Sequence, residues 1–405
     1  MSAQEPIAQS RVSLTPGGSR GLVLDLIRSY GPISRVELAT RTGLTQATLS
    51  GVARALLADG LVAEAGRAQS TGGKPRTNLQ LVSGARFAVG VQLGSESNSF
   101  VAVDLAGSVV GRMRTVGVSA STPADALRDI GETILALLSG VDVDPSKVVG
   151  VGLVAPGPID VDGGTFLGAP QLKGWKNVPA RERLAEAVGI PVILDNDASA
   201  AALGDFWSGD LPDVHAHATI YMGQGIGAGL LLNGTVLRGA SSNSGELGQT
   251  ILDTSGGRLC TLQELAAPLA VVQNALTRVY VDERYGLTES DPVGGFRRLA
   301  VGAARGDKEA AALLQGSADY LAIAVTNLAA ILDLDSVSLA GPAFADAGDI
   351  YVHAITDRLR RQFFARDRHA VRVRMSSQVS DAAAVGGAAL VLQTLLAPRT
   401  FTVGR

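Results

Sequence analysis

The chain has 405 residues, of which 46% are hydrophobic and 18% are charged, and its net charge is −3. A chain of this length usually forms more than one hydrophobic core, and the composition excludes wholesale disorder, so we expect two or three domains of an α/β protein. Because the chain has one cysteine, Cys260, no signal-peptide pattern in residues 1–10 and no uninterrupted apolar span, we expect a cytoplasmic protein without internal disulfides or membrane contact.

The charges are distributed unevenly along the chain. Residues 1–80 contain nine Lys or Arg and five Asp or Glu, a balance of +4, whereas the remainder contains 26 and 33, a balance of −7. A basic end on an acidic body is typical of a nucleic-acid-binding module attached to another domain.

The first elements predict a short helical domain. Residues 1–18 lack an apolar period and indicate a disordered leader. A first helix begins near Arg20 and ends before Gly31-Pro32. The run from Ser34 to Glu37 has the spacing of a capping box, which predicts a second helix over residues 36–41.

A third helix and a hairpin complete this domain. Thr45 is a suitable N-cap for a helix that reaches about Asp59, after a glycine turn at residues 42–44. Strands over residues 61–64 and 78–82 flank a polar, glycine-rich loop, which is typical of a wing. We therefore predict a winged helix-turn-helix DNA-binding domain over residues 19–84, with an ordinary three-helix bundle as the alternative.

The predicted contacts with double-stranded DNA lie at the helix starts and in the wing. Small and amide side chains at the start of the third helix suit base edges in the major groove, and wing cations suit phosphates. The candidate residues are Ser34, Arg35, Thr45, Gln46, Ala47, Thr48, Ser50, Lys74 and Arg76.

The second part of the chain, residues 85–397, contains an internal similarity. Three strands with glycine turns over residues 87–115 are followed by a helix over 123–138, and the same order returns over 218–237 with a helix over about 263–278. We expect two lobes, residues 85–197 with a C-terminal helix and residues 198–380, and a ligand cleft between them. Residues 398–405 form a tail.

Several glycine-rich runs in this part resemble the ROK family, which groups repressors, open reading frames and sugar kinases. The resemblance implies a winged helix-turn-helix followed by a two-lobed actin-like, hexokinase-type ATPase fold. The runs are residues 150–160, Gly174-Trp175, residues 191–198, residues 220–230, Asn233-Gly234, Arg238-Gly239 and residues 245–248.

The resemblance also implies a sugar site. Amides and carboxylates pair in two directions with sugar hydroxyls, and in a kinase of the family the residue at Asp197 would be the general base. Asn196 and Asp197 also have the pattern of a helix N-cap, and the two roles can coexist. The implied sugar-binding residues are Asn196, Asp197, Glu246, Gln249 and Glu264.

Departures from the family pattern argue against catalysis and against metal. Gln92 and Glu96 stand where the kinases have the acidic and glycine-rich run that serves magnesium and phosphates, so we expect no ATP binding and no catalytic residue. The zinc-binding cysteines are replaced by residues 253–261, which contain one cysteine, and no metal is expected. Gln249 replaces the family histidine, and Gln171-Leu172 replaces Asn-Leu. His215 and His217 are interpreted as solvated loop residues.

These observations predict a transcriptional regulator of carbohydrate metabolism, most simply a repressor. A homodimer or tetramer would bind an inverted-repeat operator, and a small-molecule sugar effector would occupy the cleft. Two alternatives are an ATP-dependent sugar kinase with an appended DNA-binding domain, and a module whose effector is another protein.

Overall fold

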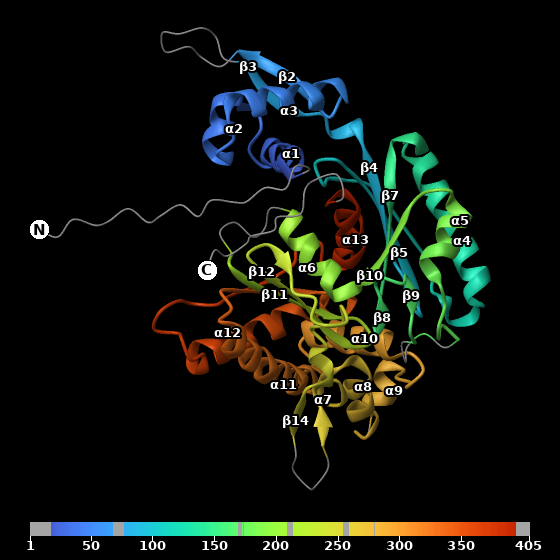
Figure 1. Cartoon of the computed structure of the whole chain (residues 1–405). Coiled ribbons are helices and arrows are strands. Elements are labelled where there is room, and N and C mark those ends of the chain that lie inside the picture. Colours follow the sequence, from blue (N-terminus) through green and yellow to red (C-terminus); the bar gives the residue numbers. More distant parts are fainter. Residues whose placement is uncertain are drawn as a thin grey trace, which may run out of the picture. The chain divides into compact units, whose positions relative to one another are not determined.

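Figure 1 shows the computed structural model, which describes residues 18–67, 77–168, 172, 174–208, 214–253, 259–278 and 280–393. The chain divides into two compact units: residues 1–87, with 104–106 and 392–405, and residues 88–103 with 107–391. The predicted tail and nearly all of the predicted leader lie outside the described residues, although the first helix includes Gly18. In the described part of the chain, no helix combines the length and apolar character needed to cross a bilayer.

The first unit has the predicted winged helix-turn-helix. Its helices are α1 (Gly18–Tyr30), α2 (Arg35–Thr42) and α3 (Gln46–Ala58), and its sheet has the strand order β1 (Ile33–Ser34), β3 (Thr77–Leu81), β2 (Val62–Arg67). The short strand β1 was not predicted; it pairs with β3 through Ile33 and Leu79. The core is formed by buried side chains of all three helices, including Leu24, Leu38 and Leu49.

The predicted helix caps are present at both turns of this unit. Ser34 Oγ accepts a hydrogen bond from the amide of Glu37 at 3.2 Å, and the Glu37 carboxylate pairs with Arg41 instead of completing the capping box. Thr45 accepts from the amide of Thr48, and Gly43 ends α2 in a left-handed conformation with φ +68°. The sequence between α2 and α3 therefore forms a tight, capped turn.

The second unit contains two five-stranded sheets of matching order. Each has three strands linked by tight turns and two further strands that enter after helical segments, as the internal similarity predicts. The first sheet has the order β10 (Val192–Asn196), β7 (Val148–Ala155), β4 (Phe87–Gln92), β5 (Ser97–Asp104), β6 (Val109–Val116). The second has the order β17 (Arg372–Met375), β16 (Ser336–Ala340), β11 (Ala216–Met222), β12 (Ile226–Leu232), β13 (Thr235–Val236).

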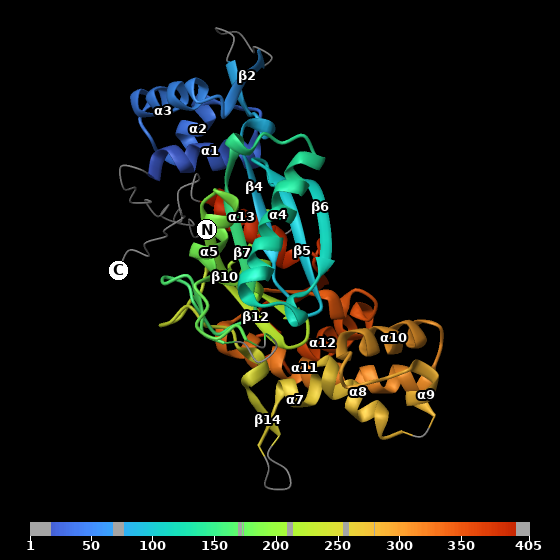
Figure 2. The ribbon, with the colours of Figure 1, turned by 90° about the vertical axis from the view of Figure 1, so that its right-hand side faces the viewer.

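Helices cover both faces of the first sheet (Figures 1 and 2). Helices α4 (Pro123–Gly140) and α5 (Ala180–Val188) pack together on one face, and α13 (Ala382–Gln393) lies on the other. The contact with α13 is close: a Cβ at Gly90 would lie 1.7 Å from the carbonyl oxygen of Ala384, and one at Gly152 would lie 1.9 Å from that of Gly387. Glycine is required at both strand positions because any side chain would displace the helix.

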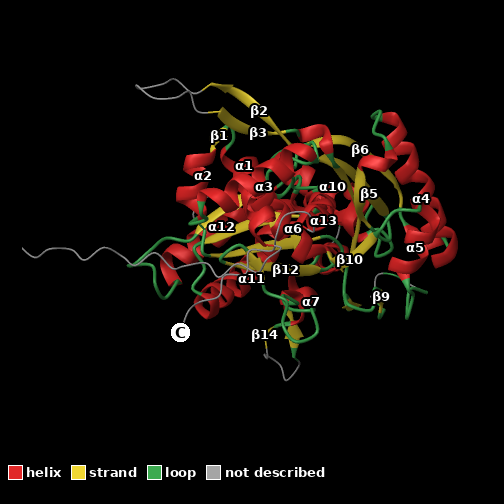
Figure 3. Ribbon diagram, turned by 45° about the horizontal axis from the view of Figure 1, so that its top comes forward, coloured by secondary structure: helices red, strands yellow, loops and turns green. Residues whose placement is uncertain are grey.

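The second sheet lies between helix α6 (Asp197–Trp207) and a helical layer, as Figure 3 shows by secondary structure. The helix predicted over residues 263–278 is interrupted after Ala266, because Pro268 has no amide proton and begins a new helix. The layer comprises α7 (Leu262–Ala266), α8 (Pro268–Leu276), α9 (Val281–Tyr285), α10 (Pro292–Ala304), α11 (Lys308–Leu332) and α12 (Gly348–Gln362). Two small ribbons complete the unit, β8 (Ile159–Asp160) with β9 (Thr165–Phe166) and β14 (Ile251–Asp253) with β15 (Cys260–Thr261).

The interpretation of His217 as a solvated loop residue is wrong. Strand β11 begins at Ala216, so His217 lies inside it and is 1% exposed, whereas His215 precedes the strand and is exposed. His217 Nδ1 lies 3.1 Å from Ser336 Oγ, and Nε2 lies 2.9 Å from Thr219 Oγ1. Burial, together with the nearby Arg374 and Arg372, lowers the pKa of His217 to about 3, so the ring is neutral.

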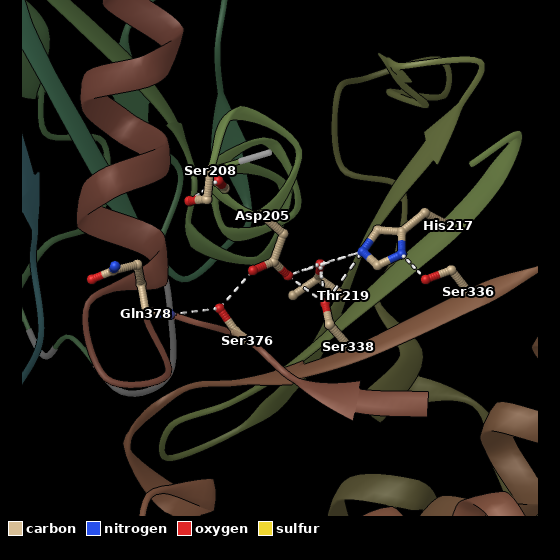
Figure 4. A network of polar contacts seen from close by, with 9 residues as sticks. Asp205, Ser208, His217, Thr219, Ser336, Ser338, Ser376 and Gln378 are labelled. Atoms are coloured by element: carbon tan, nitrogen blue, oxygen red, sulfur yellow. Dashed lines mark hydrogen bonds and ion pairs between the residues drawn. The ribbon is translucent and has the colours of Figure 1, made fainter. Parts of the chain in front are cut away.

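Asp205, near the end of α6, is the acceptor of this buried network (Figure 4). Its carboxylate accepts hydrogen bonds from Thr219 at 2.8 Å, from Ser376 at 2.5 Å and from Ser338. Because Thr219 donates to Asp205, His217 donates to Thr219 from Nε2, which assigns the tautomer. The network therefore joins α6 to β11, to β16 and to Ser376, the residue that follows β17.

Candidate ligand-binding cleft and DNA-binding face

A cavity of about 500 Å³ opens between the two lobes of the second unit. Its volume lies in the range of small-molecule sites. The ends of β4 and β11, the loop after β7 and the start of α6 provide its walls. The lining includes Gln92, Glu96, Arg114, Gly157, Asn196, Asp197, Tyr221, Gln224, Asn243, Glu246, Gln249 and Gln263.

Asn196 and Asp197 lie where β10 meets α6; Asn196 is the N-cap of the helix, Asp197 is its first residue, and both line the cavity. The Oδ1 atom of Asn196 accepts from the amide of Ser199 at 3.0 Å, and the Oδ1 atom of Asp197 accepts from the amide of Ala198 at 2.8 Å. These bonds fix both side chains at the start of the helix. The two roles that the sequence allowed, helix capping and a position in the cavity lining, are therefore compatible in one geometry.

Glu246 and Gln249 also line the cavity, but Glu264 does not belong to its lining. Gly245 has φ +87°, and a Cβ there would lie 1.8 Å from the carbonyl oxygen of Ala228, so a glycine is needed to turn Glu246 toward the cavity. The Glu264 carboxylate instead accepts from the amide of Thr261 at 2.9 Å in a capping box that begins α7. Its neighbour Gln263 lines the cavity in its place.

The carboxylates of the cavity have raised pKa values. Burial, with a further contribution from the charge of Glu246, raises the pKa of Asp197 to about 7. Although Glu246 is exposed to the open cavity, the protein around its carboxyl group raises the pKa of that group as well. Near neutral pH Asp197 therefore exists both as a carboxylate and as a carboxylic acid, and can accept or donate a hydrogen bond to a ligand hydroxyl.

Several cavity residues were missed by the sequence reasoning, among them Asn243 and Gly157. The side-chain amide of Asn243 accepts from the amide of Ile159 at 2.9 Å and donates to the carbonyl of the same residue at 3.0 Å, as a neighbouring strand would. A Cβ at Gly157 would lie 3.0 Å from Glu246 Oε1 and 3.6 Å from Asn196 Nδ2. The bare backbone of Gly157 therefore keeps open the space around which these polar groups converge.

A partly buried ion pair also supports the site from outside the cavity lining. Arg238 donates two hydrogen bonds to Asp195, at 2.9 and 2.7 Å, and Asp195 also accepts from the amide of Asn196 at 2.8 Å. Asp195 is 1% exposed. This bidentate pair ties the loop after β13 to the strand that carries Asn196, although the sequence reasoning assigned Asp195 no role.

Gln92 and Glu96 form hydrogen bonds between the two lobes. The amide of Gln92 donates to the hydroxyl of Tyr221, and Gln224 donates to Glu96 Oε1 at 2.8 Å. Burial, followed by the charge of Asp197, raises the pKa of Tyr221, so its hydroxyl stays protonated. Gln171, the remaining departure from the family pattern in this region, lies outside the described residues.

The structure describes only part of the segment in which the sequence predicts no zinc. The segment expected to lack zinc runs between β14 and β15, and residues 254–258 within it lie outside the described part of the chain. Elsewhere, no three His, Cys, Asp or Glu side chains of the described residues gather as metal ligands would. One thiol, that of Cys260, does not satisfy a tetrahedral zinc site.

The start of α3 presents the predicted DNA-contacting side chains to solvent. Thr45, Gln46, Ala47, Thr48 and Ser50 are exposed, and Thr45 and Thr48 hydroxyls lie 2.9 Å apart. Arg54, one turn after Ser50 and also exposed, was missed although its helical spacing places it on the same face.

The other residues predicted to contact DNA either have partners within the protein or lie outside the described residues. Ser34 caps α2, and Arg35 forms an ion pair with Glu64 of β2 at 3.1 Å. Both residues are half-buried. Lys74 and Arg76 of the wing lie outside the described residues.

The chain therefore combines a winged helix-turn-helix with a two-lobed α/β domain that contains a cleft. The profile of the ROK family matches residues 88–394, and the chain belongs to this family. A xylose repressor of Caldicellulosiruptor bescii is 26% identical over 382 residues, which cover 93% of this chain and 95% of that protein. A glucokinase of Halalkalibacterium halodurans is 29% identical over 317 residues, 76% of this chain and 96% of that protein.

A solved structure shows the same fold over nearly the whole length. The crystal structure of a ROK family transcriptional regulator, described as a homologue of the Escherichia coli MLC protein, has a TM-score of 0.77 to this chain at 23% identity, covering 94% of this chain and 96% of the other. The predicted fold class is therefore confirmed: a winged helix-turn-helix followed by a two-lobed, hexokinase-type domain.

Proposed function

We propose that this protein is a transcriptional regulator that binds double-stranded DNA through its winged helix-turn-helix and a sugar through the cleft of its second unit. The observation that carries the proposal is the joint presence of an exposed recognition helix and a polar cavity in a chain that aligns over 93% of its length with a xylose repressor. Sugar phosphorylation alone would not require the exposed helix α3.

The cavity supports a sugar ligand by its chemistry. Amide and carboxyl groups of Asn196, Asp197, Glu246 and Gln249 converge on one space, and leaving such groups unpaired in a closed site is costly. Occupancy would control DNA binding only if the sugar has unequal affinity for the DNA-binding and the non-binding state. We propose a repressor of carbohydrate genes, acting in the cytoplasm as a homodimer or tetramer.

The DNA site should reflect the symmetry of the oligomer. A twofold-symmetric pair of reading heads binds an inverted repeat whose half-sites lie about one helical turn apart. Gln46, Ser50 and Arg54 are exposed on α3, and we propose that Gln46 and Ser50 contact base edges and that Arg54 contacts phosphate.

Selection of genomic DNA fragments by the full-length protein tests the DNA-binding part. We expect a palindromic site to be enriched at near-physiological salt. The double variant Gln46→Ala with Ser50→Ala should lose this enrichment, whereas Gln273→Ala, an exposed amide on α8, should keep it. If all three proteins recover only background DNA in the presence and absence of a sugar panel, the proposed regulator is wrong.

The second candidate function is a sugar kinase with a DNA-binding domain. It is favoured by the alignment with a glucokinase and by the Asp197 pKa of about 7, which suits a general base. We propose that the chain is not a kinase, because Gln92 and Glu96 offer an amide and an already hydrogen-bonded carboxylate where magnesium and phosphates would need ligands. Sugar-dependent conversion of ATP to ADP would overturn this part of the proposal.

A further inference from the structure

The charged side chains of the cavity are mostly acidic. Among the described residues that line it, the charged ones are the carboxylates Glu96, Asp197 and Glu246 and one guanidinium, Arg114. Glu96 comes from the turn between β4 and β5, Asp197 from the start of α6, and Glu246 from the loop after β13. Acidic groups thus reach the cavity from both lobes.

Arg114, the one cation among the described lining residues, already has an acidic partner. Arg114 Nη2 lies 2.9 Å from Asp381, and the same carboxylate contacts Arg112 Nε at 3.3 Å. Arg112 also donates to Gln378 at 2.7 Å. When Arg112 and Asp381 are counted with the lining residues, four carboxyl groups, of which Asp197 is partly protonated near neutral pH, still oppose two guanidinium groups.

The exposed Glu96 carboxylate has a hydrogen-bond partner in the opposite lobe. Gln224, on the opposite lobe, donates to its Oε1 atom at 2.8 Å, and an amide donor stabilises the carboxylate without neutralising its charge. Arg238 is paired with Asp195 and is not among the lining residues. A phosphate or carboxylate on a ligand would therefore meet the negative charge of Glu96, together with the partly ionised Asp197 and the Glu246 carboxyl group, with one already paired arginine in the lining.

We infer that the effector of this protein is a monosaccharide without an anionic group, either uncharged or an amino sugar, and that Glu96, Asp197 and Glu246 together exclude phosphorylated and carboxylated sugars. The inference rests on the proposed sugar-sensing function and narrows its ligand class. A unit anion about 8 Å from one uncompensated carboxylate, at an effective dielectric constant of about 20, loses more than tenfold in affinity. An ammonium group gains by the same attraction.

Calorimetric titration of the full-length protein with matched sugars tests the inference. The first probe is xylose. The glucose series comprises glucose, glucosamine, glucose 6-phosphate and glucuronate, and the N-acetylglucosamine series comprises that sugar and its 6-phosphate. We expect the best-binding series to prefer its uncharged or amino member over its anionic member by at least tenfold. Tighter binding of a phosphorylated or carboxylated member would overturn the inference and leave the sugar-sensing function standing.

A charge variant separates the role of Glu96 from the general charge of the protein. Glu96→Gln keeps the size of the side chain, and we expect it to reduce the ratio of affinities for the uncharged sugar and its 6-phosphate by at least fivefold. Glu186→Gln, an exposed position on α5, makes the same change in net charge and should leave the ratio unchanged. An equal fall in both variants would contradict the assignment to Glu96, and absence of binding by every probe would overturn the sugar-sensing function itself.

Discussion

Helix α6 has a polar cluster at each end, and the two clusters differ in how their hydrogen bonds are used. At its start, Asn196 and Asp197 use one oxygen each to cap the helix and present the rest of their polar groups to a cavity. Near its end, Asp205 accepts from three buried hydroxyl groups, and its network includes a neutral histidine. The first arrangement suits a ligand and the second suits a fixed fold, because polar groups that lack protein partners need another partner.

The largest expected effect comes from breaking the buried cluster. Asp205→Ala leaves the hydroxyls of Thr219, Ser338 and Ser376 without their acceptor, and we expect the free energy of unfolding to fall by about 3 kcal/mol. Chemical denaturation measures this change. Ser208→Ala, an exposed hydroxyl that follows the same helix, is the control and should cost less than about 0.5 kcal/mol. Equal losses of stability in Asp205→Ala and Ser208→Ala would contradict the structural role assigned to the buried cluster.

The corresponding change at the open end should affect ligand binding instead of folding. Asp197→Ala removes a hydrogen-bonding group from the cavity and should weaken sugar binding by about 100-fold, equivalent to about 2.7 kcal/mol. Operator binding in the absence of sugar should persist. Calorimetry and a DNA mobility assay measure the two properties, and loss of operator binding by a folded variant would count against separate roles.

A third prediction uses the pH dependence of the buried end. His217 stays neutral in the folded chain down to about pH 3, whereas the unfolded chain takes up the proton below about pH 6.5. Acidification therefore favours unfolding, and the wild type should lose about 1.4 kcal/mol relative to His217→Gln between pH 7.5 and 5.5. Denaturation at both pH values measures the difference. The exposed His215→Gln should show no such change, and a flat difference for His217→Gln would mean that the ring is not held neutral.

The smallest expected effect is the opposite pH dependence at the open end. The folded-state pKa of Asp197, about 7, lies above its unfolded value of about 4, so the ionised group destabilises the folded chain at pH 8. This cost falls as the pH drops through 7 and disappears only near the unfolded pKa. Without ligand, Asp197→Asn should be more stable than the wild type at pH 8 by about 1 kcal/mol, after screening at the cavity is allowed for. The advantage should shrink at pH 5.5, and a constant difference would contradict the raised pKa.

Local patterns in the sequence predicted much of the fold and part of the site. The caps at Ser34 and Thr45 and the wing strands follow from short-range rules, and the glycine-rich runs placed Asn196, Asp197, Glu246 and Gln249 at one cavity. The prediction that Glu264 lines the cavity was wrong, because Glu264 belongs to the capping box of α7. Its spacing from Thr261 is a capping-box signal that local rules could have detected.

The missed contacts join residues that are distant in the sequence. Asn243 binds Ile159, Arg238 binds Asp195, and the partners of His217 include Ser336. Periodicity within one element cannot show which strands become neighbours, so the buried position of His217 depended on pairing that its own segment does not encode. Hydrogen bonds between the lobes, such as that of Gln224 with Glu96, belong to the same class.

The close contact of α13 with β4 and β7 has a consequence for synthesis. Strand β7 ends at Ala155, whereas the helix that covers it begins at Ala382. At roughly 5–20 residues per second, the face of the first sheet waits on the order of 10–50 s for its covering helix to leave the ribosome. During this interval the nascent chain presents an uncovered apolar strand surface, and chaperones that hold such surfaces would find their binding site there until the last helix arrives.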